Sequence, residues 1–261
     1  MKRTLITVDV GEYPATYRPL LQGAAVYDSS CSPEARVLLI ERDGGCFLKS
    51  APAGTLRNEA VMTRYFGEKG LGATVLDHRT EAGRDWLLTT RVAGEDCTHY
   101  LEDPKRLCDL IATRLRALHE LPVFDCPVPD RTSSFLAAAE EGYRIGRCDL
   151  DFHAPPQGPF VTAKEAFGFL QENKHLLARD TLLHGDYCLP NIMLDNWRFS
   201  GFIDVGNGGV GDRHVDLFWG AWTLAFNLKT EAYRDRFFDA YGRDKIEPHL
   251  LSVVAAAEVF G

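Results

Sequence analysis

The sequence has no stretch close to the roughly 18 uninterrupted apolar residues of a membrane-spanning helix. A secretory signal is not expected either, because Asp9 and Glu12 interrupt the apolar run behind the basic N-terminal residues. The chain also has no internal repeats and no low-complexity segment. These absences favour a cytoplasmic protein with no membrane partner.

Paired cysteines and basic clusters are missing as well. The seven cysteines are scattered and none belongs to a CxxC pair, which argues against a zinc site or a disulfide framework and is typical of the reducing cytoplasm. Acidic residues outnumber basic ones, 37 to 29, for a formal net charge of −8. A nucleic-acid partner requires basic patches and is therefore not expected, whereas a cationic ligand is compatible with this charge.

What the sequence does contain is a globular composition whose first third is rich in strand signals. Hydrophobic residues make up 45% of the 261 positions and charged residues 25%, enough to bury a sizeable core. In the first ninety residues short β-rich runs alternate with turn residues, and one helix is expected from Leu56 to about Lys69, ended by Gly70. The expected strands cover residues 20–27, 36–41, 46–49 and 85–96.

Helix signals dominate the remainder of the chain. Asp103-Pro104 combines an N-cap with a first-position proline, and Thr162 with Glu165 gives a capping-box signal. Apolar residues at helical spacing follow both signals. The expected helices run from 104 to about 121, onward from 163, and from 248 to 260, with a loop at 153–160.

These patterns predict an α+β protein with two lobes. The small β-rich N-terminal lobe is expected at residues 1–92 and the larger, mostly helical lobe at 93–261, with a hinge at about 89–95. At 261 residues, the chain has the length for two lobes that share an interface.

The stretch "LLHGDYCLPNIMLDNWRFSGFIDVG" at 182–206 places three hydrophilic side chains at the ends of apolar runs. Asp186 and Asn191 are five residues apart, and Asp204 precedes Gly206 by two, as in the catalytic and metal-binding segments of protein kinases. Magnesium prefers oxygen ligands and keeps several waters, so one amide and one carboxylate suffice. An unmetallated Asp186 can accept a hydrogen bond from an attacking hydroxyl. The pattern predicts phosphoryl transfer.

A second feature supports the same chemistry. Kinase-type sites use a strand lysine for the nucleotide phosphates and a helix glutamate that holds it. Lys49 ends the apolar run 46–48, and Glu59 lies on the next expected helix. Either residue alone is typical of a solvated surface charge, but together they stand in the expected order ahead of the Asp/Asn/Asp set.

The chain resembles the aminoglycoside phosphotransferase family, in particular its 3′-phosphotransferase branch, over most of its length. The motifs that carry the resemblance are "HGDYCLPNIM", "FSGFIDVG", "GRDWLL", "ALHEL", "DCP" and the terminal Glu-x-Phe. The resemblance implies a protein-kinase-like fold and ATP-dependent transfer of the γ-phosphate to a hydroxyl. That hydroxyl is expected to be the 3′-OH of an aminoglycoside antibiotic, so the enzyme would confer resistance. The implied cofactors are ATP, with GTP as an alternative donor, and Mg²⁺; the implied partner is a small cationic substrate, and the implied state is a monomer or weak dimer.

Carried over position by position, the resemblance implies a role for each matched residue. Asp186 would be the catalytic carboxylate, Asn191 and Asp204 would hold magnesium, and Lys49 with Glu59 would grip the nucleotide phosphates. Ser32 in the 31–33 loop would cover the phosphates, and the backbone at Thr90 and Val92 would bind adenine. The implied acceptor-binding residues are Asp149, Asp151, Glu258 and Phe260.

The chain departs from the family on the substrate side. Asn207 stands where the family has an arginine, Trp222 replaces a second arginine, and Phe226-Asn227 replaces an acidic pair. The residues predicted to bind the nucleotide and magnesium match the family pattern. The alternative function is therefore a kinase of another small hydroxylated metabolite or antibiotic on the same fold.

Three further side chains near the motifs have structural interpretations. His184 is expected to hold the catalytic loop through hydrogen bonds to backbone, and Asp216 to bond to the same loop, whereas Asp212 is expected to be a solvated loop charge.

Other function classes fit less well. A protein kinase would need a GxGxxG loop, a DFG motif and an Ala-Pro-Glu, and the chain has none of them. A metallophosphoesterase would need further histidine ligands, and Asn207 is followed by two glycines instead. An inactive binding module is disfavoured because every catalytic residue is present.

Overall fold

The structure is a computed structural model that describes residues 3–150 and 160–261. Antiparallel sheets and helices together confirm the mixed α+β class. The chain divides into two compact units, Met1–His99 with Pro190–Gly206 and Tyr100–Leu189 with Asn207–Gly261. Within the described ranges no helix is both long and apolar enough to span a membrane.

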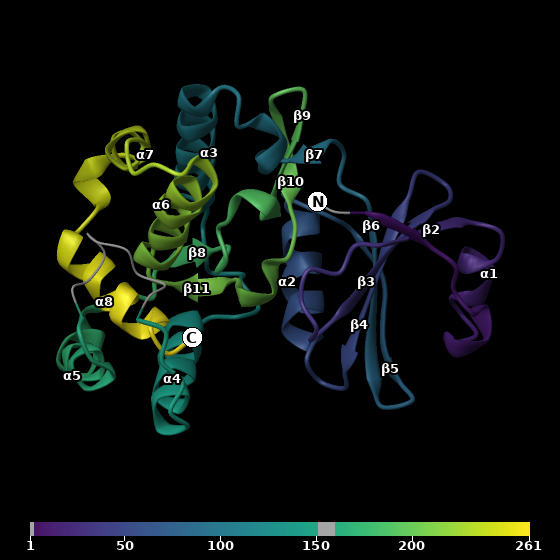
Figure 1. Cartoon of the computed structure of the whole chain (residues 1–261), viewed down its shortest axis with the longest axis horizontal. Coiled ribbons are helices and arrows are strands. Elements are labelled where there is room, and N and C mark those ends of the chain that lie inside the picture. The colour runs from purple at the N-terminus through teal and green to yellow at the C-terminus, as the bar shows by residue number, and fades with distance from the viewer. Residues whose placement is uncertain (1–2, 151–159) are drawn as a thin grey trace. The chain divides into compact units, whose positions relative to one another are not determined.

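The first unit is built on a six-stranded antiparallel sheet with the order β1-β2-β3-β4-β6-β5 (Figure 1). Its helices are short except for α2. The strands are β1 Thr4–Ile6, β2 Ala25–Asp28, β3 Arg36–Glu41, β4 Cys46–Pro52, β5 Val75–Glu81 and β6 Arg84–Thr90; the helices are α1 Arg18–Leu21 and α2 Arg57–Glu68.

The two faces of this sheet bury different clusters, because side chains alternate along each strand. On one face Leu48 of β4 and Leu88 of β6 pack with the segment around α1, including Tyr17. On the other face Ala51 of β4 packs with Ala60 of α2. Residue 49 has the same parity as residue 51, so the side chain at this position is directed to the face that α2 covers.

A second, three-stranded sheet of the first unit has the order β10-β9-β7. Its strands are β7 Glu95–Asp96, β9 Ile192–Asp195 and β10 Arg198–Phe202. Gly94, at φ +85°, allows this pairing: a Cβ there would lie 2.0 Å from the Leu194 carbonyl oxygen. The glycine therefore lets the segment after β6 come into backbone contact with the β9–β10 hairpin.

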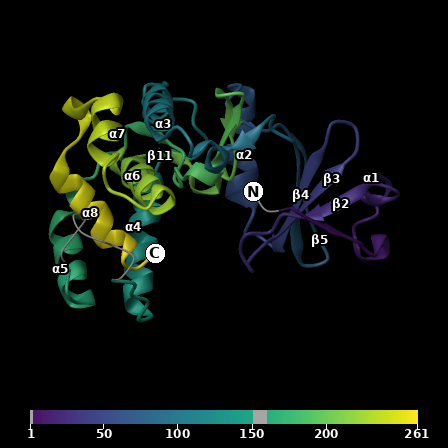
Figure 2. The same cartoon turned by 45° about the horizontal axis from the view of Figure 1, so that its top comes forward.

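The second unit is mainly helical, with a two-stranded antiparallel sheet of β8 and β11 (Figure 2). Helix α8 packs against α4, α5 and α6, and α3 packs against α6 and α7. The elements are α3 Pro104–His119, α4 Arg131–Arg144, α5 Ala163–Asn173, β8 Thr181–Leu183, β11 Gly209–Gly211, α6 His214–Leu228, α7 Arg234–Tyr241 and α8 Pro248–Glu258. The short 3₁₀ helices of the chain are Val10–Glu12, Cys97–Tyr100, Lys174–Leu176, Leu189–Asn191, Val205–Asn207 and Arg243–Lys245.

Most of the elements expected from the sequence are confirmed, with two corrections. The strand expected at 20–27 begins only at Ala25, because residues 18–21 form the helical turn α1. The strand expected at 85–96 is two strands, since the chain leaves the large sheet after Thr90 and pairs with β9 from Glu95. Residues 151–159, which include most of the expected 153–160 loop, lie outside the described residues.

Candidate active site

Lys49 is the centre of an ion-pair cluster in the first unit. Its Nζ lies 2.7 Å from Glu59 Oε2 on α2 and 3.0 Å from Asp204 Oδ1. The side chain of Asp204 is half exposed, whereas those of Lys49 and Glu59 are mostly buried. The structure thus brings together three residues that are 10 and 155 positions apart in the sequence.

Burial and the charges within this cluster explain the pKa shifts of Lys49 and Glu59. Burial alone would lower the pKa of Lys49, but the carboxylates of Asp204 and Glu59 outweigh burial and raise that pKa. The pKa of Glu59 is raised, chiefly by burial and also by the negative charge of Asp204, against the opposing effect of Lys49. One ammonium therefore faces two carboxylates. The excess negative charge favours binding of a further cation or of a ligand that carries one.

Asn191 and Asp204 lie next to each other in the first unit. The Ile203 N–H donates to the Asn191 carbonyl oxygen at 3.0 Å, which fixes the two neighbouring segments. Asp204 has φ +58°, a left-handed conformation that non-glycine residues rarely adopt and that recurs at functional sites. An amide and a carboxylate suit Mg²⁺, whose remaining ligands are phosphate oxygens and waters. No group of three or more His, Cys, Asp or Glu that could hold a metal occurs in the described part of the chain. The amide of Asn191 and the carboxylate of Asp204 are the predicted pair of Mg²⁺ ligands.

The predicted nucleotide contacts lie in the same unit. Ser32 is exposed in the loop between β2 and β3, and its hydrogen bond to Glu34 lowers the pKa of that carboxyl. Thr90 ends β6, where its N–H donates to the Thr74 carbonyl at 2.9 Å. Val92 is buried and packs with Ala73 and Met193. Their assignment to phosphate and adenine remains a prediction.

The catalytic-loop sequence follows β8 in the second unit and is held by Asp216 of α6. The N–H groups of His184 and Gly185 both donate to the Asp216 carboxylate at 2.7 Å. The Asp186 N–H donates to His184 Nδ1 at 3.3 Å, and His184 is fully buried. The structural interpretations of His184 and Asp216 are therefore confirmed.

The interpretation of Asp212 as a solvated charge is wrong. Asp212 is 1% exposed; it accepts a hydrogen bond from the Ala178 N–H at 2.7 Å and lies 2.6 Å from His214 Nδ1. Its pKa is lowered because the bonds to His214 and Ala178 outweigh the raising effect of burial. Asp212 follows β11 directly, and this burial depends on segments remote in sequence.

A buried histidine, His119, contacts Asp216, the residue that holds the catalytic loop. His119 Nε2 lies 3.1 Å from Asp216 Oδ2, and its Nδ1 lies 2.8 Å from the Tyr241 hydroxyl. Because a carboxylate only accepts, Nε2 is assigned the proton and Nδ1 accepts from Tyr241. Burial lowers the pKa of His119, which favours this neutral form. The "ALHEL" motif thus contributes a side chain that orients Asp216.

The predicted acceptor residue Glu258 ends α8. Its Oε1 accepts from Trp219 Nε1 at 2.9 Å. Burial, together with the negative charge of Asp186, raises the pKa of Glu258 to about 7, against the effects of Trp219 and Arg131. Phe260, two residues on, is fully buried and packs edge-to-face on Tyr143. It anchors the end of the chain rather than presenting a face to solvent.

The two predicted acidic-loop residues have different outcomes. Asp149 is exposed and its N–H donates to the Val259 carbonyl at 2.8 Å, which brings it next to the C-terminal segment. Asp151 lies outside the described residues. The roles of both in binding an acceptor stay predictions.

The four departures from the family also have defined surroundings. Asn227 Nδ2 donates within α6, to the Thr223 carbonyl at 2.8 Å. Trp222 and Phe226 stack with ring centroids 4.8 Å apart, and Lys229 Nζ lies 4.2 Å from the Phe226 centroid. The aromatic pair therefore occupies the helix face where the family pattern has charges.

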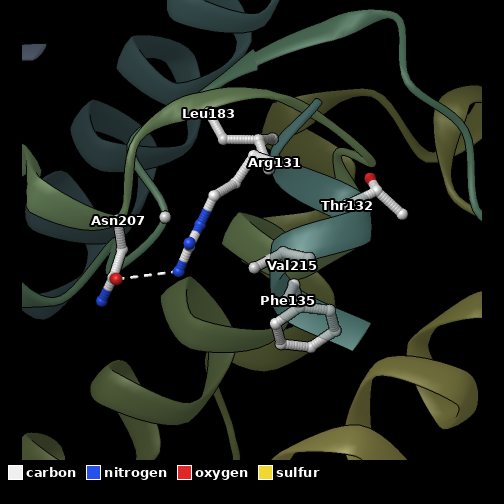
Figure 3. A pocket seen from close by; sticks show the side chains of 7 residues that line it. Arg131, Thr132, Phe135, Leu183, Asn207 and Val215 are labelled. Atoms are coloured by element: carbon white, nitrogen blue, oxygen red, sulfur yellow. Dashed lines mark hydrogen bonds between the residues drawn. The ribbon is translucent and has the colours of Figure 1, made fainter. Parts of the chain in front are cut away.

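Asn207 pairs with a residue that the sequence analysis missed. Arg131, the first residue of α4, donates through Nη2 to Asn207 Oδ1 at 2.8 Å (Figure 3). Both side chains line a small pocket that Gly185 also lines. The only sequence signal at this position is the Asp130 N-cap, which locates a helix start and says nothing of a ligand.

Comparison with known proteins identifies the family. The model of the phosphotransferase enzyme family matches residues 29–251. A probable aminoglycoside 3′-phosphotransferase from Lactococcus lactis is 48% identical over 258 residues, 98% of each chain. The chain therefore belongs to the phosphotransferase enzyme family and is an enzyme, as the motifs predicted.

Solved structures of related enzymes share the fold. An aminoglycoside-3′-phosphotransferase of type VIII matches with a TM-score of 0.75 at 23% identity, over 96% of both chains. An aminoglycoside phosphotransferase from Streptomyces rimosus, in complex with ADP and streptomycin, matches with a TM-score of 0.69 at 24% identity, over 87% of this chain and 91% of that one. The kinase-like α+β fold predicted from the sequence is confirmed.

Proposed function

We propose that this enzyme transfers the γ-phosphoryl group of ATP to the 3′-hydroxyl of an aminoglycoside antibiotic and thereby confers resistance. The observation that carries the proposal is the bridge from Lys49 to both Glu59 and Asp204, at 2.7 and 3.0 Å. The 48% identity to a probable aminoglycoside 3′-phosphotransferase along nearly the whole chain supports the acceptor class and the site of transfer.

The proposed binding of the nucleotide rests on the charged residues of the first unit. The Lys49 ammonium, oriented by Glu59, is suited to bind the α- and β-phosphates of ATP. Asp204 is half exposed beside it and would hold Mg²⁺ together with Asn191. When bound, Mg²⁺ neutralises charge on the phosphate oxygens. The complex of a related enzyme with ADP supports an adenine nucleotide as donor.

The acceptor side follows from the catalytic loop. Asp186 is partly exposed, and its backbone is fixed through His184, so its carboxylate can accept a hydrogen bond from the attacking hydroxyl. The transition state of phosphoryl transfer is loose, so alignment of the hydroxyl contributes more than deprotonation. Glu258 lies close enough to Asp186 for that carboxylate to raise the pKa of Glu258, and it is placed to attract an acceptor ammonium. An ATP donor and seven free cysteines support action in the cytoplasm.

The magnesium assignment has its own test. Replacing Asp204 by Asn removes one ionic ligand but keeps the size of the side chain, so the Mg²⁺ concentration for half-maximal rate should rise about tenfold or more. The measurement is a Mg²⁺ titration of initial rate at fixed ATP. An unaltered Mg²⁺ dependence in this variant would remove Asp204 from the metal site.

An acceptor panel with radiolabelled ATP tests the proposed function against its alternative. The panel contains kanamycin, streptomycin, an amino alcohol and a macrolide. Labelled kanamycin as the preferred product supports the proposal. Transfer only to the amino alcohol or the macrolide would favour the other small-molecule kinase, for which the altered residues 207, 222, 226 and 227 leave room.

A further inference from the structure

The pocket around Arg131 is bordered by the catalytic loop of the second unit. Gly185, which precedes Asp186, lines this pocket, and a Cβ at Gly185 would lie 1.9 Å from the Asn207 carbonyl oxygen. Asn207 is thus in backbone contact with the catalytic loop, and its side chain accepts from Arg131 at 2.8 Å. Asn207 therefore connects the guanidinium of Arg131 to the segment that presents the Asp186 carboxylate; Figure 3 shows the bond between Arg131 and Asn207.

The pocket is small and is lined by both apolar and polar side chains. Phe135, Leu183 and Val215 supply apolar surface, and Arg131 and Asn207 supply polar groups. The pocket is much smaller than the roughly 300–1,000 Å³ sites that enclose a drug-sized ligand. The pocket is too small to enclose an acceptor, so Arg131 and Asn207 would meet at most one edge of an acceptor ring.

Arg131 supplies hydrogen-bond donors and a positive charge at this pocket. Its guanidinium has five N–H donors, no acceptor and a permanent positive charge, and burial lowers its pKa against the attraction of Glu258. Glu258 in turn interacts electrostatically with Asp186. The surroundings of Asp186 therefore combine an anion that attracts an ammonium with a cation that repels one and can donate to a hydroxyl oxygen.

We propose that Arg131, held by Asn207, is a specificity-determining residue. It selects acceptors that carry a hydroxyl, and disfavours those that carry an ammonium, at the ring position beside the phosphorylated hydroxyl. This inference rests on the proposed function, because it assumes that Asp186 receives a sugar hydroxyl. The inference gives a role to Asn207, which stands where the family has an arginine on the acceptor side of the site.

The test compares two acceptors that differ at one position. Kanamycin has a hydroxyl at 2′, next to the 3′-hydroxyl, and its 2′-amino analogue has an amine there. The wild type should have the higher kcat/KM for kanamycin. In Arg131→Gln, the ratio of kcat/KM for the two acceptors should fall roughly tenfold, since the like charge proposed to face that ring position is removed. Arg131→Lys keeps the charge and should keep most of the preference.

A second variant leaves Arg131 in place. Asn207→Asp adds a carboxylate beside the guanidinium at an exposed position, so it should also lower the preference for the 2′-hydroxyl. The inference is overturned if the ratio is unchanged in Arg131→Gln and Asn207→Asp. It is equally overturned if both acceptors lose rate by the same factor, which would indicate contact with the phosphoryl group or a structural role. If the wild type phosphorylates neither acceptor, the proposed function falls together with the inference.

Discussion

Single residues of this enzyme carry charges that their surroundings only partly compensate. Asp204 combines a positive φ with half exposure and an ion pair to Lys49, an arrangement that is unfavourable for folding alone and useful for holding a cation. Glu258 is a second example, since it is largely removed from water and shares its surroundings with Asp186. Both features are of the kind that clusters at functional sites, which supports the roles proposed for Asp204 and Glu258.

Replacement of Asp186, the proposed catalytic carboxylate, should separate chemistry from nucleotide binding. We expect Asp186→Asn to lower kcat by roughly 10²- to 10⁴-fold, because the amide is a poor acceptor for the attacking hydroxyl. The KM for ATP should change little, since the nucleotide charges are compensated by Lys49. Steady-state kinetics check both values, and Asp195→Asn, at an exposed aspartate that ends β9, is the matched control. Retained turnover would exclude Asp186 from this role.

Glu258 should make acceptor binding depend on pH. Its folded-state pKa of about 7 exceeds the ordinary value of 4.5, so the native carboxyl is mostly protonated at pH 6 and ionised at pH 8. The KM for a cationic acceptor should therefore fall, by up to about tenfold, as the pH rises through 7. The same shift means that stability decreases between about pH 4.5 and 7, where only the unfolded chain has lost this proton.

The control for this dependence is Glu258→Gln, which keeps the hydrogen bond from Trp219 within reach and cannot ionise. Its acceptor KM should show only the titration of the acceptor amines. Identical pH profiles for the two proteins would refute the assignment of Glu258 as the titrating acceptor contact.

At the scale of elements, α6 organises the catalytic loop. Asp216 near its start accepts from His184 and Gly185, and Thr223 two turns later accepts from the Leu189 N–H at 3.1 Å. The loop is therefore hydrogen-bonded at both of its ends to one helix, which limits its conformational freedom. A rigid element is a better platform for a reacting carboxylate than a free loop.

Thr223 offers a test of this platform. The residue is 1% exposed, and Thr223→Val keeps the shape but leaves the buried Leu189 N–H without its acceptor. We expect a loss of about 1–3 kcal/mol in the free energy of unfolding and a lower kcat. Thr223→Ser keeps the hydroxyl and should retain most of the activity. Thermal denaturation and initial rates provide the comparison; a fully active and stable valine variant would contradict the proposed support.

At the scale of the whole molecule, the sequence predicts contacts that depend on local order better than those that depend on packing. Lys49 ends a short apolar run and Glu59 lies on the next expected helix, the order that kinase-type sites use, so their pairing could be predicted. Asp212 could not be placed, because its burial depends on His214 and on the Ala178 backbone. Arg131 could not be linked to Asn207 across 76 residues, since no local pattern specifies how α4 meets the end of the metal-binding motif.

The substrate side illustrates the same limit. The motifs predict a phosphotransferase because nucleotide, metal and catalytic groups lie in short segments of fixed spacing. The proposed acceptor contacts come from the ends of separate elements, Glu258 of α8 and Arg131 of α4. Their combination is set by the tertiary fold, and the departures at 207, 222 and 226 change it further.

The most direct test of the account is mass spectrometry of kanamycin and of a 3′-deoxy analogue after incubation with the enzyme, ATP and Mg²⁺. We predict that kanamycin gains one phosphate and that the 3′-deoxy compound gains none. Phosphorylation of the 3′-deoxy compound to the same extent, or kanamycin recovered unmodified, would contradict transfer to the 3′-hydroxyl.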